Sequence, residues 1–164
     1  MSTINRIRRR LLQQGLPGLL GLGGAALLTG RSAKAHHTDT HFEDDTAHKV
    51  VYQLNKADHD YIEHVLFSCG ELLRKYGDDI MLVIVCFGPG LQLLGKKPTR
   101  PIDPIHQQRV KSLMDYGVKV IACGNTMKAL QWSESDLLYY SAIEEIGADV
   151  LMQLQEQGYS YISW

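Results

Sequence analysis

The sequence has few cysteines, and their spacing excludes the usual cysteine-based devices. Only three of its 164 residues are cysteine, at positions 69, 86 and 123. No two of them form a CxxC pair, which excludes a thioredoxin-like redox motif and a zinc ribbon. Because the number is odd, at least one thiol must be free or bonded to another chain.

The chain also lacks an uninterrupted apolar run of the length that spans a membrane. The segment 11–29 is apolar, but five glycines and one proline interrupt it. A permanent span needs about 20 strongly apolar residues, so we predict no stable membrane span. A cluster of arginines precedes this segment, and Ala33-Lys34-Ala35 follows it with the small-x-small pattern of a cleavage site. We therefore predict that residues 1–35 are an export signal, cleaved after Ala35, and that the mature protein is periplasmic.

The arginine cluster favours the twin-arginine class of signal. Residues 8–13 read RRRLLQ, which resembles an arginine pair followed by any residue and two apolar residues. The mildly hydrophobic segment and the positive Arg31 and Lys34 before the cut suit that pathway, whereas Ile7 departs from the usual serine or threonine. An ordinary secretory signal with a chance arginine run is the alternative. A twin-arginine substrate crosses the membrane folded, which favours reduced thiols in the mature protein.

Without this leader the chain has little positive charge. The leader holds six of the 17 basic residues and none of the 18 acidic ones, so the remainder has 11 basic and 18 acidic residues, a net charge of −7. Such a domain repels phosphate backbones, so we predict no nucleic-acid partner. The 129 residues that remain are enough for one compact core.

Residues 36–48 form a polar stretch that we interpret as a flexible arm. The arm is rich in possible metal ligands: His36, His37, His41, Glu43, Asp44, Asp45 and His48. Imidazole and carboxylate groups suit zinc, copper or nickel, but no fixed ligand spacing is visible. We therefore predict a solvated tail, no metal site and no cofactor, with a metal-chaperone role for the arm as an alternative.

Strand and helix patterns alternate over residues 49–164. The expected strands are 49–54, 80–87, 118–122 and 159–164, with a further short strand or helix within 135–146. The expected helices are 59–76, 91–94, 105–116, 127–131 and 149–157. The run IMLVIVCF at 80–87 is continuously apolar, which is typical of a strand buried on both faces of a parallel sheet. The fold class is therefore α/β, a three-layer α/β/α sandwich with a mainly parallel sheet of about five strands.

Ligands of open parallel sheets bind beyond the carboxyl ends of the strands. Three segments fall there: 55–58, 88–90 and 123–126. Cys123 is the candidate catalytic residue, because backbone amides and a helix dipole at a strand-to-helix junction stabilise a thiolate. The alternative is that Cys123 is a small buried hydrophobe, which we expect of Cys69 and Cys86. The candidate ligand-binding residues are Asn55, Gly88, Pro89, Gly90, Gly124, Asn125 and Thr126.

Four segments give the sequence a family resemblance. KVVYQL, IMLVIVCFGPG, YGVKVIACGNT and LQEQGYSYI together resemble the DsrE/DsrF-like family over residues 49–164. The resemblance implies a flavodoxin-like sandwich, assembly into homo-oligomers, and a persulfide carried on one cysteine after a central strand. Cys123 is similar to that position, so the implied partners are a small sulfur compound or a partner-protein thiol.

The resemblance leaves two functions open. The first is a carrier or sulfurtransferase that relays sulfane sulfur through Cys123. The second is a non-catalytic module that binds a small ligand or serves through its assembly. The aromatic residues Tyr139, Tyr140, Tyr159, Tyr161 and Trp164 either line a subunit interface or cover the edge of their own sheet.

Overall fold

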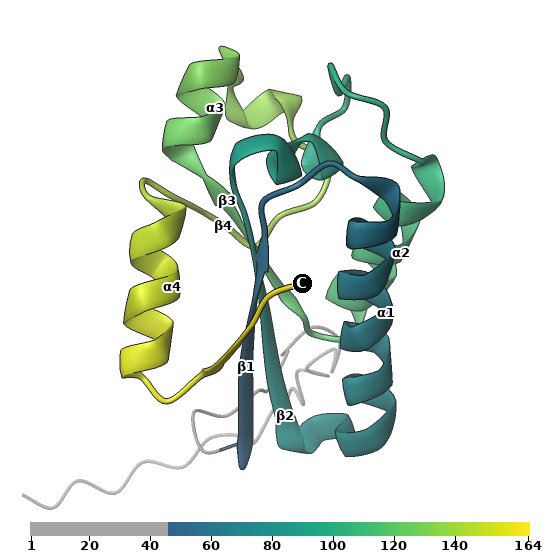
Figure 1. Cartoon of the computed structure of the whole chain (residues 1–164), viewed down its shortest axis with the longest axis vertical. Coiled ribbons are helices and arrows are strands. Elements are labelled where there is room, and N and C mark those ends of the chain that lie inside the picture. The colour runs from purple at the N-terminus through teal and green to yellow at the C-terminus, as the bar shows by residue number, and fades with distance from the viewer. Residues whose placement is uncertain (1–45) are drawn as a thin grey trace, which may run out of the picture. The chain divides into compact units, whose positions relative to one another are not determined.

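The computed structural model describes residues 46–164, which form one parallel sheet with helices on both faces (Figure 1). The predicted signal peptide and most of the predicted arm lie outside the described residues. The strands are β1 (His48–Leu54), β2 (Ile80–Cys86), β3 (Lys119–Cys123), β4 (Ala142–Glu144) and β5 (Ser160–Ile162). Their order in the sheet is β4-β3-β2-β1-β5, and every neighbouring pair is parallel. The predicted α/β fold class is confirmed.

The helices form the outer layers of the sandwich. They are α1 (His59–Tyr76), α2 (Pro104–Asp115), α3 (Gly124–Leu130) and α4 (Gly147–Glu156), with short 3-10 helices η2 (Gly77–Asp79), η3 (Gly88–Leu94) and η4 (Glu134–Asp136). Figure 1 shows α1 and α2 on one face of the sheet and α4 on the other, with α3 beyond the carboxyl ends of the strands. Within residues 46–164, no helix has the length and apolar character needed to cross a membrane.

Local sequence signals explain where the two longest helices begin. The Asp58 side chain accepts a hydrogen bond from the Tyr61 amide at 3.0 Å and caps α1. Asp103 caps α2 in the same way through the Ile105 amide, also at 3.0 Å. Pro104 occupies the first position of α2, where a missing amide proton costs no helical hydrogen bond.

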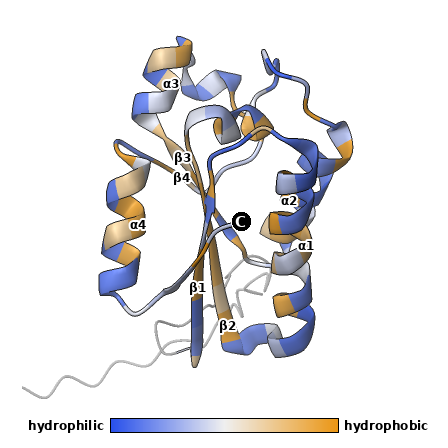
Figure 2. Cartoon of the chain, in the orientation of Figure 1, coloured by the Kyte–Doolittle hydropathy of each residue, from blue (hydrophilic) through white to orange (hydrophobic). Residues whose placement is uncertain are grey.

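The core lies mainly between the sheet and the α1–α2 layer. All seven residues of β2 are buried, which confirms the expectation from its unbroken apolar run. The larger cluster takes in inward side chains of α1, β1, β2 and α2. A smaller cluster on the α4 face consists of Val51, Val83, Val85 and Leu151. In Figure 2 the apolar side of α1 faces the sheet.

The strand register brings the carboxyl ends to one level. Leu54 of β1 pairs with Cys86 of β2, and Cys86 pairs with Ala122 of β3. The residues that follow these three are therefore neighbours at the same edge of the sheet. This edge is where the sequence predicted the site.

Two local features differ from the sequence-based expectation. The segment 88–90, expected as a sharp stop, forms the first turn of η3. Helix α3 begins at Gly124, with Cys123 as its N-cap, and not at Met127 after an Asn125 or Thr126 cap. The reason is a backbone link: the Asn125 amide donates to the Glu145 carbonyl at 3.0 Å, which satisfies an amide that a capping side chain would otherwise serve.

Candidate functional site

Backbone links join the ends of the three central strands. The Phe87 amide, just after β2, donates to the Leu54 carbonyl at the end of β1 at 3.1 Å. The Gly88 amide donates to the Thr126 hydroxyl oxygen of α3 at 2.9 Å. The loops that the sequence placed at this edge are thus held together by hydrogen bonds between different elements.

Cys123 is the last residue of β3 and lies on the α4 face of the sheet. Its side chain is buried, with 5% exposed. Its sulfur accepts a hydrogen bond from the Gly147 amide at 3.3 Å, and its thiol donates to the Glu145 carbonyl at 3.7 Å. Glu145 lies in the connection from β4 to α4, and Gly147 is the first residue of α4. The sulfur therefore has one donor and one acceptor, both within the short segment 145–147 where the chain enters α4.

Gly147 lies close to the cysteine because it has no side chain. A Cβ atom at this position would lie 3.2 Å from Phe87 and 3.3 Å from the Cβ of Cys123. Such contacts are tighter than ordinary van der Waals packing, so an alanine would push the loop away from the sulfur. The absence of a side chain thus fixes the amide-to-sulfur distance.

The surroundings of Cys123 favour a thiolate. Burial is the largest single effect and raises the pKa of the thiol, but the Thr126 hydroxyl and the amides of Thr126 and Gly147, with a smaller effect of the nearby Asn125 amide, together outweigh burial and lower the pKa below its usual value. Because the Thr126 oxygen already accepts the Gly88 amide, its own proton is available to the sulfur. The site can therefore hold a nucleophilic sulfur.

The other two cysteines have the opposite character. Cys69 on α1 and Cys86 on β2 are fully buried, and burial raises the pKa of both thiols. All three cysteines are free. The structure therefore places Cys69 and Cys86 in the core, as predicted.

The predicted ligand-binding residues separate into two groups. Asn125 and Thr126 lie near the Cys123 sulfur, Gly88 is hydrogen-bonded to Thr126, and Gly124 directly follows Cys123 at the start of α3. Gly90 lies against β1 instead: a Cβ atom there would be 2.2 Å from the Leu54 carbonyl oxygen. The role visible for Gly90 is therefore close packing of η3 on β1.

Asn55 and Pro89 have other partners at the same edge. The Asn55 side chain accepts a hydrogen bond from the Tyr61 hydroxyl at 3.1 Å, which ties the loop after β1 to α1. Pro89 lines a separate hollow of about 410 Å³. The other residues that line this hollow are Lys56, Ala57, Asp58, Arg100 and Pro101.

Sequence reasoning missed the contribution of the β4–α4 connection. Glu145 and Gly147 lie 22 and 24 residues after Cys123, and only the pairing of β4 with β3 brings them to the sulfur. Gly147 at the start of a helical pattern was the one available signal. Within residues 46–164, no group of three or more histidine, cysteine, aspartate or glutamate side chains is placed to hold a metal ion.

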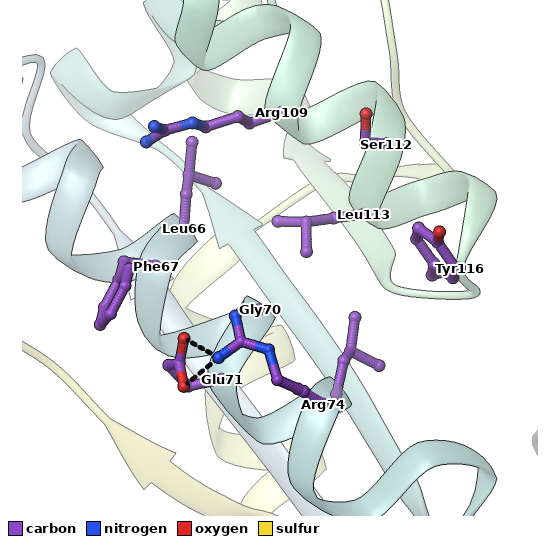
Figure 3. A pocket seen from close by; sticks show the side chains of 10 residues that line it. Leu66, Phe67, Gly70, Glu71, Arg74, Arg109, Ser112, Leu113 and Tyr116 are labelled. Atoms are coloured by element: carbon purple, nitrogen blue, oxygen red, sulfur yellow. Dashed lines mark hydrogen bonds and ion pairs between the residues drawn. The ribbon is translucent and has the colours of Figure 1, made fainter.

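A groove between α1 and α2 lies on the opposite face of the sheet from Cys123. It encloses about 600 Å³, and Figure 3 shows Leu66 and Leu113 directed into it, with the Arg74–Glu71 ion pair at one end. The remaining lining residues are Phe67, Gly70, Leu73, Arg109, Ser112 and Tyr116. None of the predicted site residues lines this groove.

Fold and site together define a class of protein: a parallel α/β sandwich with a hydrogen-bonded thiol at the carboxyl end of an inner strand. The model of the DsrE/DsrF-like family matches residues 48–164, and the chain belongs to this family. Membership associates it with sulfur relay in general terms. No curated protein matches the sequence.

Solved structures share the fold at low sequence identity. MTH1491 of Methanobacterium thermoautotrophicum, a protein of unknown function, is 20% identical with a TM-score of 0.63, over 71% of this chain and 99% of that chain. The ychN protein of E. coli is 16% identical with a TM-score of 0.50, over 71% of this chain and 97% of that chain. At these identities the similarity shows the fold alone.

Proposed function

We propose that this protein binds and relays sulfane sulfur as a persulfide on Cys123. One observation carries the proposal: the Cys123 sulfur lies at the end of β3 among hydrogen-bond donors that favour its thiolate. The thiolate is the form of cysteine that attacks a sulfur atom. Membership in the DsrE/DsrF-like family supports the same chemistry.

The reaction consists of two sulfur-transfer steps with no net oxidation. The Cys123 thiolate attacks the sulfane sulfur of a donor, the sulfur–sulfur bond of the donor breaks, and the donor's remaining part leaves with the electron pair. An acceptor thiolate then attacks the outer sulfur of the Cys123 persulfide. This second step returns Cys123 to its thiolate, ready for another donor.

The hydrogen-bond donors around Cys123 serve both ends of this cycle. The Gly147 amide and the Thr126 hydroxyl stabilise the anionic sulfur before attack, and again when Cys123 becomes the leaving group. A stabilised thiolate is a better leaving group. The same contacts therefore suit uptake and release.

Intact-mass measurement tests the proposal. The reduced protein is incubated with thiosulfate or polysulfide, and we expect it to gain the mass of one sulfur atom, which dithiothreitol removes. Cys123→Ser should show no gain, whereas the matched variants Cys69→Ala and Cys86→Ala should still load. An unchanged mass in the native protein, or sulfur that persists in Cys123→Ser, would overturn the proposal. That result, with an unreactive Cys123, would favour a non-catalytic binding or assembly module.

We also propose that the protein acts in the periplasm after twin-arginine export, and as a homo-oligomer. The arginine-rich leader supports export. The exposed aromatic side chains of Tyr161 and Trp164 support an interface, since aromatic residues are enriched at subunit contacts.

Two replacements of Thr126 distinguish the effect of its hydroxyl group from the effect of its side-chain volume. In Thr126→Val the sulfur loses a donor while the side-chain volume stays similar, so we expect the alkylation of Cys123 near neutral pH to slow about tenfold. This factor corresponds to roughly 1.5 kcal/mol for a hydrogen bond to a charged group. Thr126→Ser keeps the hydroxyl and should react at close to the native rate. Labelling with iodoacetamide, quenched after a series of times, measures both rates. Equal rates in the valine and serine variants would contradict the role of the Thr126 hydroxyl as a donor to the sulfur.

A further inference from the structure

Two histidines join the first turns of α1 and α2, and the proposed function uses neither of them. His59 is the first residue of α1 and is exposed, whereas His106 lies in the first turn of α2 and is fully buried. The Nε2 atom of His106 lies 3.0 Å from the Nδ1 atom of His59, at hydrogen-bond distance. Their ring centroids are 4.6 Å apart.

Charged groups surround the buried ring on its other side. The Nδ1 atom of His106 has no hydrogen-bond partner and lies 3.6 Å from the Glu63 carboxylate. Glu63 itself is ion-paired with Arg109 of α2, and this pair lowers the pKa of the Glu63 carboxyl. The groups that act on His106 are thus His59 and Glu63 from α1, and Asp103 and Arg109 from α2 and its cap.

The hydrogen bond between the two rings depends on how many protons their facing nitrogen atoms carry. A hydrogen bond between two imidazole nitrogens needs one nitrogen with a proton and one without. If both rings carry the extra proton, two N–H groups and two positive charges face each other across 3.0 Å, and the bond is lost. Both rings also lie at helix N-termini, where the helix dipole disfavours a cation.

Burial keeps His106 neutral in the folded protein. Burial has the largest effect and lowers the pKa of His106, and the charge of His59 acts in the same direction; the raising effects of Glu63 and Asp103 are smaller, and the lowering effect of Arg109 is the smallest. A group whose pKa is lower in the folded state binds fewer protons there than in the unfolded chain. The stabilising contribution is complete above about pH 6.5, the ordinary pKa of histidine, and is lost as the pH falls toward the folded value.

We propose that the His59–His106 pair is a proton-operated latch that holds the first turns of α1 and α2 together at neutral pH and releases them on acidification. The latch acts on the carboxyl edge of the sheet. Asp58, which caps α1, lines the 410 Å³ hollow together with Arg100 and Pro101 of the loop that leads to α2. Release of the two turns frees two walls of this hollow.

Hydrogen exchange measured on the full chain at about pH 7.5 and about pH 5.5, with intrinsic rates corrected, tests the latch. Peptides that cover the first turns of α1 and α2 should exchange about tenfold faster at the lower pH, relative to peptides from β2. His59→Gln removes the imidazole that faces His106, so the acid-dependent increase should fall well below tenfold, to the part that the burial of His106 alone produces. The matched control is His64→Gln, which removes an exposed histidine of the same helix that contacts Trp164 instead.

Three outcomes decide the proposal. An acid-dependent increase that is strongly reduced in His59→Gln and retained in full in His64→Gln supports it. An exchange rate that changes no more than that of β2 overturns it, as does an increase in His59→Gln as large as that of the native protein. Because the readout involves neither sulfur nor Cys123, it is independent of the sulfur-loading experiment.

Discussion

Native protein treated with iodoacetamide is expected to gain one adduct, at Cys123, while Cys69 and Cys86 stay unmodified. Cys123 lies at a loop-covered edge with a lowered pKa, so small local movements of the β4–α4 connection expose a thiolate. Cys69 and Cys86 are fully buried in the core with raised pKa values, and they react only when the domain opens globally. For a domain of ordinary stability this difference amounts to a factor of about 10³ or more in rate. Peptide mass spectrometry after timed labelling measures all three sites.

The pH dependence of this labelling tests the lowered pKa of Cys123 separately. Because the pKa of Cys123 lies below that of an ordinary thiol, its rate should rise with pH and reach its plateau earlier than that of glutathione in the same buffer. In urea the three cysteines should react alike. Native labelling of Cys86 at the rate of Cys123, or no native labelling of Cys123, would contradict the assigned environments.

Gly90→Ala should destabilise the fold strongly, although it adds only one methyl group. The added Cβ would lie 2.2 Å from the carbonyl oxygen of Leu54 and 2.6 Å from its carbonyl carbon. Both atoms belong to the backbone of a central strand, so the clash is relieved only by moving η3 away from β1. We expect a loss on the order of 3 kcal/mol in the free energy of unfolding, the upper range for overpacking. Urea denaturation measures it.

Gly70→Ala is the matched control for this prediction. Gly70 lies within α1, and a Cβ atom there meets nothing within 4 Å. Alanine should therefore stabilise the domain by roughly 0.5–1 kcal/mol through helix propensity. If both variants shifted the urea midpoint in the same direction, the steric explanation for Gly90 would be wrong.

The sequence was sufficient to predict the elements whose signals are local. The unbroken apolar run of β2 predicts a strand buried on both faces, and the Asp58 cap with Gly77 at the end gives the bounds of α1. β4 has only three residues and is partly exposed, so no periodicity could mark it. Its position follows from pairing with β3, which is a tertiary contact.

The candidate site could likewise be predicted only as far as local sequence signals reach. The end of β3 and Gly124 identify Cys123, because strand ends and glycine are visible in one segment. Its contacts with Glu145 and Gly147 depend on where the chain returns more than 20 residues later. The His59–His106 contact spans 47 residues and has no sequence pattern at all.

The contacts of the Cys123 sulfur make the β4–α4 connection sensitive to the charge on the thiol. The neutral thiol donates its proton to the Glu145 carbonyl, so loss of that proton leaves two electron-rich atoms facing each other. The Gly147 amide, which donates to the same sulfur, is drawn closer by the same change. Ionisation of the thiol thus repels the Glu145 carbonyl and attracts the Gly147 amide of the next peptide group. The Gly147 amide resonance is consequently expected to report, without any added label, whether the thiol is protonated or ionised.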